Sequence, residues 1–270
     1  MTSLEYPALG QLLRDRGKVS QMGRFIVTFD RVGSTNERAV FLARRGAPHG
    51  CLVLAREQTA GKGRWQRRWI SRLGGLYLSS VLRPSCGEEG APELLPLACS
   101  VAASEAISHA SRVSSRVRWP NDLLVQGKKV GGILCEASFS GDKLEFVVAG
   151  FGINVNQLPE DFSSGLTETA ISLRMATGCE FDELLLAACL VERLEVWWKA
   201  CSGGADGIRK RWAELAHGEK GMTVMVEAKD GKTFDALTVG LAEDGGLRVR
   251  LEDGREQVLY SEDVVYFKPL

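Results

Sequence analysis

Near residues 218–221 the hydrophobic pattern of this chain changes to a period of two residues, and we place a domain boundary at this change. From Met222 onward apolar and polar residues alternate, and glycine turns separate short runs. The expected strands are Met222–Ala228, Thr233–Leu241, Leu247–Leu251, Glu256–Tyr260 and Val264–Phe267. Asp230-Gly231, Gly245-Gly246 and Asp253-Gly254 have the composition of hairpin turns. Residues 219–270 are therefore predicted to form a small SH3-like β-barrel.

The preceding residues, 24–218, mix helical and strand patterns and predict a larger α+β domain. Strands are expected at Phe25–Phe29, Cys51–Ala55, Leu76–Leu82 and Lys143–Ala149. Helices are expected at Thr35–Arg45, Leu94–Ala110, Asp182–Ala200 and Gly207–His217. Residues 1–23 form an N-terminal extension, with one helix expected over Leu4–Arg16. The extension is too short to bury a core of its own, so we expect it to pack on the larger domain.

Composition narrows the possible functions. The 270 residues carry no formal net charge and the pI is about 6.8, which makes no global electrostatic case for binding nucleic acid or a membrane. No apolar run approaches the roughly 20 residues that span a bilayer, and the N-terminus does not resemble a secretory signal. Seven cysteines without a Cys-x-x-Cys pair predict reduced thiols in a cytoplasmic protein. Three scattered histidines argue against a zinc site or a histidine triad.

The stretch Gln58–Trp69 is the first candidate for chemistry. It contains two glycines, four cations and two tryptophans, and it lies between two expected strands. Glycine lets backbone N–H groups approach an anion closely, and Arg64 and Arg67 can bind phosphate oxygens bidentately. The alternative is a basic surface loop whose aromatic residues fold back on the core. A Walker P-loop is excluded, because Gly63 follows Lys62 where Ser or Thr is required.

Three further motifs have both a structural and a functional interpretation. Ser34-Thr-Asn-Glu37 reads as a helix cap with a capping box, or as a helix start whose side chains hold a polar ligand. Arg118–Val125 contains Trp-Pro-Asn-Asp, which reads as a tight turn before a strand. Gln126–Glu136 places lysines at a glycine turn and then two glycines in a strand, where a ligand or another backbone can approach closely.

Together, and in this order, these motifs resemble the biotin protein ligases. The resemblance rests on Ser34-Thr-Asn36, Gln58–Trp69, Arg118–Asp122, Lys129–Leu134 and Gly150-Phe-Gly-Ile-Asn154, followed by the C-terminal module. It covers nearly the whole chain from about residue 25. It implies a mixed sheet flanked by helices, a class II synthetase-like catalytic domain, followed by the SH3-like domain.

The resemblance also implies a reaction and a set of site residues. Biotin and MgATP give biotinyl-5′-AMP and pyrophosphate, and a lysine of a biotin carboxyl carrier domain then takes the biotin and releases AMP. Lys129 and Arg64 match the catalytic residues. The implied biotin-binding residues are Ser34, Thr35, Asn36, Gln58, Gly61, Lys62, Gly63, Arg64, Lys129, Gly132 and Leu134. The implied ATP-binding residues are Arg64, Arg67, Trp69, Asn121, Asp122, Lys129 and Asn154. The metal ligands stay unassigned.

This sequence departs from the family pattern at two positions of the glycine loop. Lys62 replaces the usual arginine, which keeps the charge and loses the bidentate fork. Gln66 replaces an expected glycine, so we expect altered backbone angles in the closed loop.

Other functions stay open at this point. A lipoate or octanoate ligase shares the implied fold and chemistry, and a catalytically dead scaffold is a third class. A biotin-sensing repressor would need an N-terminal winged helix, and only about two dozen residues precede Phe25, so we expect no DNA binding. The expected partner is the carrier domain of acetyl-CoA carboxylase or a related carboxylase. We expect no membrane contact, and the chain is a monomer or a homodimer.

Overall fold

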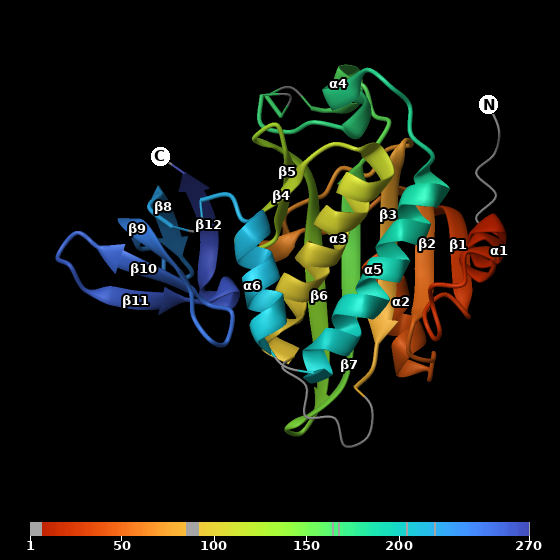
Figure 1. The fold of residues 1–270 in the computed structure, drawn as a ribbon, viewed down its shortest axis with the longest axis horizontal. Coiled ribbons are helices and arrows are strands. Elements are labelled where there is room, and N and C mark those ends of the chain that lie inside the picture. The colour runs from red at the N-terminus through yellow and green to blue at the C-terminus, as the bar shows by residue number, and fades with distance from the viewer. Residues whose placement is uncertain are drawn as a thin grey trace.

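A seven-stranded mixed sheet forms the centre of the larger part of the chain (Figure 1). The computed structural model describes residues 7–84, 92–163, 165–166, 168–203, 205–218 and 220–269. The strands are β1 (Ile26–Val32), β2 (Cys51–Gln58), β3 (Gly75–Leu82), β4 (Ser115–Arg118), β5 (Asp122–Val125), β6 (Lys128–Ser140) and β7 (Lys143–Asn154). Their order is β1-β2-β3-β7-β6-β5-β4, with β1 and β2 parallel and the other neighbours antiparallel. The mixed sheet implied by the resemblance is thus confirmed.

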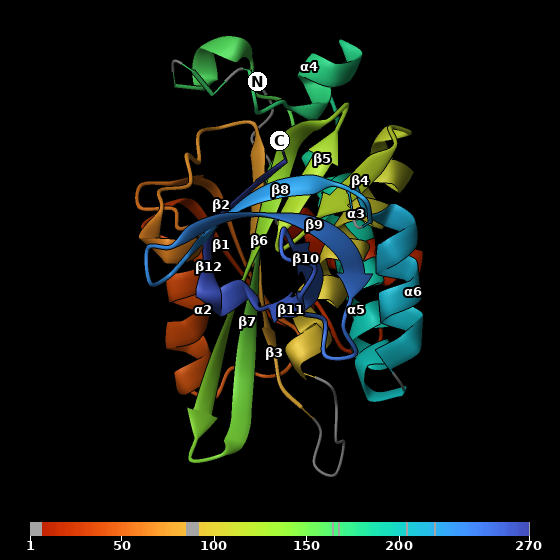
Figure 2. The same cartoon turned by 90° about the vertical axis from the view of Figure 1, so that its left-hand side faces the viewer.

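Helices cover both faces of this sheet, with α2 on one side and α3, α5 and α6 on the other (Figure 2). The helices are α1 (Pro7–Arg16), α2 (Thr35–Arg44), α3 (Leu95–Ser111), α4 (Leu173–Thr177), α5 (Glu183–Gly203) and α6 (Ala205–Leu215). Short 3₁₀ turns occur at η1 (Arg64–Gln66), η2 (Pro92–Leu94), η3 (Pro159–Asp161) and η4 (Ser261–Asp263). None of the helices in the described ranges is long and apolar enough to cross a membrane.

The apolar run in β2 explains why this strand lies inside the sheet. Cys51 and Val53 pack with Ala39 of α2, whereas Leu52 and Leu54 belong to the larger core cluster on the opposite face. Successive side chains of a strand point to opposite faces, so a strand that is covered on both sides is apolar at every position. The unbroken run Cys51–Ala55 is buried throughout.

The N-terminal segment packs on the larger domain, as predicted. Leu9 and Leu13 of α1 are buried in the main core cluster. Downstream of α1, the backbone N–H groups of Ser20 and Met22 donate to the buried Glu195 carboxylate of α5. The predicted helix began at Leu4, but residues 4–6 lie outside the described residues, and α1 begins at Pro7.

The C-terminal module is a five-stranded antiparallel sheet in the order β11-β10-β9-β8-β12. Its strands are β8 (Thr223–Ala228), β9 (Thr233–Leu241), β10 (Leu247–Leu251), β11 (Glu256–Leu259) and β12 (Val264–Pro269), close to the predicted limits. In the described strands pairing ends at β11 and β12, so the predicted small barrel is a half-barrel (Figure 2). The predicted domain boundary at 218/219 lies between the end of α6 and the start of β8.

One element differs from its predicted extent in a way that bears on function. The strand expected over Lys143–Ala149 continues to Asn154 as β7, so the motif Gly150–Asn154 is part of the strand. Gly150 and Gly152 pair with Leu134 and Gly132 of β6. Paired backbone groups are satisfied on both sides, which keeps this glycine-rich segment extended.

Candidate active site

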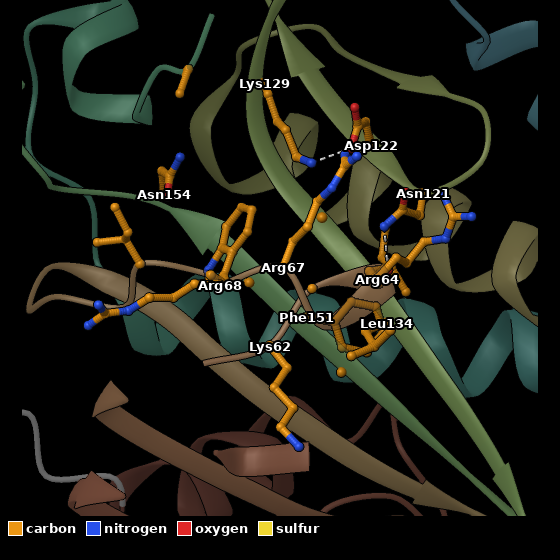
Figure 3. A pocket seen from close by; sticks show the side chains of 18 of the residues that line it. Lys62, Arg64, Arg67, Arg68, Asn121, Asp122, Lys129, Leu134, Phe151 and Asn154 are labelled. Carbon is orange, nitrogen blue, oxygen red and sulfur yellow. Dashed lines mark hydrogen bonds and ion pairs between the residues drawn. The ribbon is translucent and has the colours of Figure 1, made fainter. Parts of the chain in front are cut away.

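A single cavity of about 760 Å³ collects the residues that the sequence singled out (Figure 3). It lies on the α2 face of the sheet, where the glycine loop, β5, β6, β7 and the C-terminal module meet. The predicted residues on its wall are Ser34, Thr35, Asn36, Gln58, Lys62, Gly63, Arg64, Arg67, Trp69, Asn121, Asp122, Lys129, Gly132, Leu134 and Asn154. Gly61 is absent from this wall. Its carbonyl accepts from Trp69 N–H inside the loop, at 2.9 Å.

Gln58 and Thr35 form a neutral polar region at the start of α2. The Gln58 side-chain oxygen accepts from Thr35 N–H at 2.7 Å and from Thr35 Oγ1 at 3.1 Å. The Gln58 amide nitrogen donates to Ser71 Oγ at 2.8 Å. A primary amide carries two N–H donors, so one N–H of Gln58 has no assigned acceptor among the described residues. This region can donate to, and accept from, a neutral polar ligand.

Asn36 is held by the protein itself. Its amide nitrogen donates to Glu136 Oε2 at 2.7 Å and to Leu134 O at 3.2 Å. Its amide oxygen accepts from Ser79 Oγ at 2.6 Å. Both amide N–H donors are therefore in use, and the residue is 5% exposed. Asn36 thus joins α2 to β3 and β6 at the wall of the cavity.

The predicted capping box forms only in part. Ser34 Oγ accepts from Glu37 N–H at 3.4 Å, which caps α2. The Glu37 carboxylate, however, pairs with Lys62 Nζ at 2.5 Å instead of completing the box. Lys62 of the glycine loop is thereby tied to the first turn of α2. The pKa of Lys62 is raised by this hydrogen bond and by the charge of Glu37.

The glycine loop is a hairpin that folds back on itself. Gln58 pairs with Ser71 and Lys62 with Arg68 as antiparallel bridges, and Gly63 N–H donates to Arg67 O at 2.7 Å. The loop was predicted simply as a connection between two strands, whereas backbone pairing gives it a defined shape. At its tip Gln66 has φ 58°, in the left-handed region that glycine favours. Gln66 therefore keeps a conformation suited to the glycine expected there.

An ion triad lies where β5 meets β6. Lys129 Nζ is 2.5 Å from Asp122 Oδ1 (Figure 3). Arg118 donates to Asp122 Oδ2 at 2.6 Å. Burial would raise the pKa of the Asp122 carboxyl, but the charges of Lys129 and Arg118 and their hydrogen bonds outweigh it, so this pKa is lowered. Asp122 thus holds two cations beside the cavity in a defined geometry.

Two glycines of β7, Gly150 and Gly152, form part of the floor of the cavity. A Cβ at Gly150 would stand 1.9 Å from Asn36 Oδ1, and one at Gly152 would stand 2.5 Å from Trp69 Nε1. Only glycine allows Asn36 and Trp69 to lie this close to β7. The indole of Trp69 also lies 5.5 Å from Lys129 Nζ, so an aromatic face and a cation adjoin each other.

Comparison with known proteins identifies the family. A profile of the biotin/lipoate A/B protein ligase family matches residues 28–154. The bifunctional ligase/repressor BirA of Bacillus subtilis is 34% identical over 252 residues, which are 92% of this chain and 75% of that protein. The biotin–[acetyl-CoA-carboxylase] ligase of Paracoccus denitrificans is 32% identical over 239 residues, 86% of this chain and 97% of that protein.

This chain belongs to the biotin protein ligase family. Among solved structures, the biotin protein ligase from Aquifex aeolicus in complex with biotin and ATP superposes with a TM-score of 0.78 at 27% identity. That match covers 92% of this chain and 100% of the Aquifex chain. The family resemblance inferred from the motifs is thereby confirmed, as is the combination of a mixed sheet and a five-stranded C-terminal module.

One wall of this biotin protein ligase site was not predicted from the sequence. The connection between β7 and α5 brings Phe162, Leu166 and Glu168 to the cavity. This connection is hydrogen-bonded to the start of β6, where Lys129 N–H donates to Thr169 O at 2.8 Å. No regular hydrophobic pattern marks this connection in the sequence, so the sequence does not reveal where it folds.

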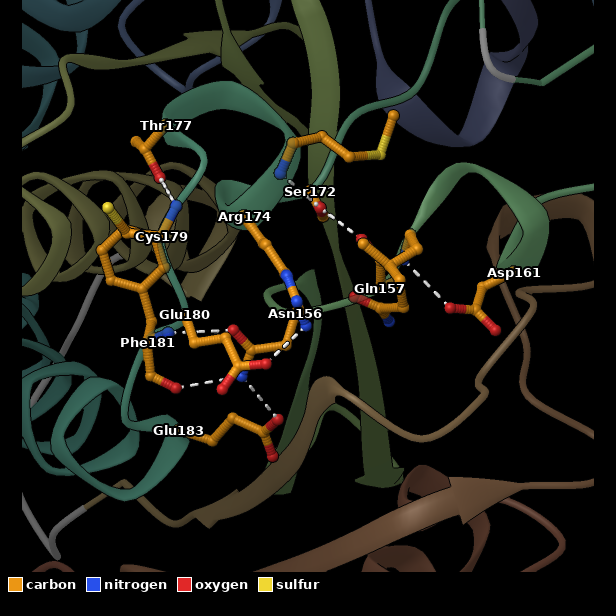
Figure 4. Close-up of polar contacts among 12 residues, drawn as sticks. Asn156, Gln157, Asp161, Ser172, Arg174, Thr177, Cys179, Glu180, Phe181 and Glu183 are labelled. Carbon is orange, nitrogen blue, oxygen red and sulfur yellow. Dashed lines mark hydrogen bonds and ion pairs between the residues drawn. The ribbon is translucent and has the colours of Figure 1, made fainter. Parts of the chain in front are cut away.

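Polar contacts fix the base of that connection (Figure 4). The Asn156 side chain accepts from Phe181 N–H at 2.9 Å and donates to Phe181 O at 2.9 Å. Ser172 Oγ donates to Gln157 O at 2.6 Å. Because both ends of the connection are bonded to each other, Phe162, Leu166 and Glu168 are held at the wall of the cavity.

The C-terminal module supplies a second unpredicted wall. Val265 and Phe267 of β12 line the cavity together with His217. The ring of Phe267 packs edge-on against Trp119 at a centroid distance of 5.4 Å. These contacts join residues about 150 positions apart in sequence, so no local pattern signals them.

Proposed function

We propose that this chain is a biotin–[biotin carboxyl carrier protein] ligase. A carboxylate oxygen of biotin attacks the α-phosphorus of ATP, the bond to the β-phosphate breaks, and biotinyl-5′-AMP and pyrophosphate form. The amine of a carrier lysine then attacks the carbonyl carbon of the anhydride. The amide forms, AMP leaves with the bonding electron pair, and the amine loses a proton. Membership of the family, and its relatives named as ligases of acetyl-CoA carboxylase, support this assignment.

One observation carries the proposal, namely that a single cavity joins a neutral polar region to a cationic one. Ser34, Thr35 and Gln58 stand at the start of α2, and a Cβ at Gly132 would lie 3.7 Å from Lys129 Nζ. Leu134 lies two residues beyond Gly132 on β6, roughly 7 Å along a strand. A ligand with a polar ring, a short aliphatic chain and a terminal carboxylate matches this order of surfaces.

The cations beside the cavity lower the main energy barrier of adenylation. Two anions, the biotin carboxylate and the α-phosphate, must approach each other, and each well-placed positive group lowers such a barrier by about 3–4 kcal/mol. Lys129 already stands beside the cavity, paired with Asp122. An incoming anion competes with Asp122 for Lys129, while Arg118 continues to neutralise the aspartate. Lys129 can thus turn to the substrates without leaving a bare buried carboxylate.

The nucleotide is expected at the β5 end of the cavity. Asn121 Nδ2 donates to Ile133 O at 2.9 Å, which turns its side-chain oxygen away from that strand, and Trp69 offers an aromatic face for the adenine. ATP enters as MgATP. Groups of three or more metal-ligating side chains are absent from the described residues, so the triphosphate is proposed to supply most of the oxygen ligands of Mg²⁺.

A lipoate or octanoate ligase is the nearest alternative, since the family profile includes both classes. Octanoate and the dithiolane ring of lipoate offer no N–H or C=O groups to the region around Gln58 and Thr35. Buried polar groups left without partners cost about 1–3 kcal/mol each. The polar region therefore favours biotin.

ATP–pyrophosphate exchange with purified protein tests the proposal, run in parallel with biotin and with lipoate. Exchange that depends on biotin, followed by transfer to a biotin carboxyl carrier domain, is the expected result. Exchange with lipoate alone would overturn the substrate. Exchange with neither, in protein shown to be folded by circular dichroism, would overturn the enzymatic assignment.

Two expectations about partners stay predictions. We expect no DNA binding, and a gel shift at low salt tests this, since tight sequence-specific retention would contradict it. The choice between monomer and homodimer requires sedimentation of the protein with and without biotin. Placement in the cytoplasm likewise remains a prediction from the reduced cysteines.

A further inference from the structure

The tip of the glycine loop contacts the C-terminal module through two neighbouring side chains. Trp65 Nε1 donates to the backbone oxygen of Val264 at 2.8 Å. Arg64 Nη2 donates to the same oxygen at 2.7 Å and also to the backbone oxygen of Ser261. Ser261 begins η4, between β11 and β12, and Val264 is the first residue of β12. The loop thus bridges the two parts of the chain over the cavity.

These contacts orient Arg64. Both hydrogens of Nη2 are used by the carbonyls of Ser261 and Val264. The remaining guanidinium N–H groups have no assigned acceptor among the described residues, and Arg64 lines the cavity. Burial lowers the pKa of Arg64, so the guanidinium needs close acceptors to remain buried in its charged form. The two carbonyls provide them and fix the direction of the fork.

The backbone at the tip needs such support. Trp65 has φ 56° and Gln66 has φ 58°, two consecutive residues in the left-handed region without glycine. Side chains carrying a Cβ adopt this region at a cost, and it persists where surrounding contacts hold it. The base of the loop is held by Lys62 and Glu37, at 2.5 Å. At the tip, Trp65 is 41% exposed, so its hydrogen bond rather than burial holds it in place.

We propose that Trp65 is a positioning residue that locks the glycine loop onto the C-terminal module through the Val264 carbonyl. The lock keeps Arg64 directed at the cavity and keeps the loop closed over the reaction intermediate. This inference rests on the proposed function, since it concerns the retention of biotinyl-5′-AMP. Trp65 itself takes no part in the chemistry.

The lock acts on the competition between two fates of the adenylate. In the productive fate, the carrier lysine attacks the anhydride carbonyl carbon and AMP leaves. In the wasteful fate, a water oxygen attacks the same carbon. The bond between this carbon and the bridging phosphate oxygen breaks, and biotin, AMP and a proton are released. A closed loop keeps water from the anhydride. Loosening the tip therefore increases the wasteful fraction.

Trp65→Phe tests the inference, because it keeps an aromatic ring and removes the indole N–H. Trp197→Phe is the matched control. Trp197 Nε1 donates to Glu105 Oε2 at 3.0 Å, and both residues lie on helices on the face of the sheet opposite α2. The measurement is the ratio of pyrophosphate released to biotin transferred to a carrier domain. The first-order decay of isolated enzyme-bound adenylate in the absence of carrier provides a second readout.

We expect Trp65→Phe to raise this ratio and the decay rate about two- to tenfold, the factor that corresponds to one hydrogen bond. Trp197→Phe should match the wild type. Trp65→His restores a ring N–H donor, and we expect it to lie between the wild type and Trp65→Phe.

An unchanged ratio and decay rate in Trp65→Phe would overturn the inference and leave the proposed function standing. Equal increases in the Phe and His variants would overturn it as well, because the ring rather than the N–H would then be responsible. A wild-type protein that forms no adenylate would instead refute the proposed function. The two failures are therefore distinguishable.

Discussion

Replacement of Lys129 by alanine separates catalysis from folding in this protein. Lys129 Nζ stands 2.5 Å from Asp122 Oδ1 and lines the cavity, so the change removes one cation from the reaction site. Loss of one group that stabilises developing charge typically costs about 10²–10³ in rate, or about 3–4 kcal/mol. We expect adenylate formation to slow by this factor.

The effect on stability should be much smaller, because Asp122 keeps its second partner. A buried carboxylate left without a partner costs about 3–5 kcal/mol, but Arg118 still donates to Asp122 at 2.6 Å. We therefore expect a loss of about 1–2 kcal/mol in the free energy of unfolding. That corresponds to a fall in Tm of about 2–8 °C for a domain of this size.

Rapid-quench formation of biotinyl-5′-AMP from labelled ATP measures the rate, and calorimetry measures Tm. Lys143→Ala is the control, since Lys143 is an exposed lysine at the far end of the same β6–β7 hairpin. Lys129→Arg keeps the charge and should recover part of the rate. A Lys129→Ala protein that is folded and forms adenylate within tenfold of the wild type would refute the assigned role.

Other predictions follow from single contacts. Gln58→Ala should weaken biotin binding about ten- to thirtyfold, because it removes an N–H donor and leaves Thr35 without its acceptor; an unchanged Kd by titration calorimetry would contradict this. Gly150→Ala places a methyl group 1.9 Å from Asn36 Oδ1, so we expect the free energy of unfolding to fall by about 1–3 kcal/mol in urea titrations. An unchanged free energy of unfolding would contradict this, because Asn36 would then move aside without cost. Burial would raise the pKa of Glu195, but hydrogen bonds from Lys199, Ser20 and Met22 lower it from 4.5 to about 2. The ionised carboxylate therefore adds about 3 kcal/mol to the free energy of unfolding. This contribution is complete above pH 4.5 and is lost as the pH falls toward 2. Glu195→Gln should flatten this part of the pH dependence of unfolding, and an unaltered profile would refute the contribution.

Local patterns predicted most of the elements. The alternation after Met222 and its glycine turns predicted five strands, because the period of side-chain direction is a property of each strand alone. The apolar run Cys51–Ala55 predicted a buried strand for the same reason. Boundaries were less well predicted where tertiary pairing extends an element, as when β7 is lengthened by the pairing of residues 150–153 with β6 and of Asn154 with β3.

The candidate site divides in the same way. Its motifs were recognisable because each is a short run of chemically unusual residues, such as Gln58–Trp69, and the structure brings nearly all of them to one cavity. The roles of Asn36 and Glu37 were not readable from the sequence. Both depend on partners that only folding supplies, namely Glu136 and Ser79 for Asn36, and Lys62 for Glu37.

The sequence by itself determined the kinds of elements, the two-part organisation and the chemical types that gather at the site, since these depend on composition and spacing over short stretches. Only the tertiary structure decided which side chains are already hydrogen-bonded within the protein. It also decided that Val265 and Phe267 of the C-terminal module line the cavity, and that Val264 contacts the glycine loop. Hydrogen-bond partners and apolar contacts join residues up to 200 positions apart. The residues adjacent in sequence do not reveal such contacts, because a segment has the same local pattern whichever distant segment it packs against.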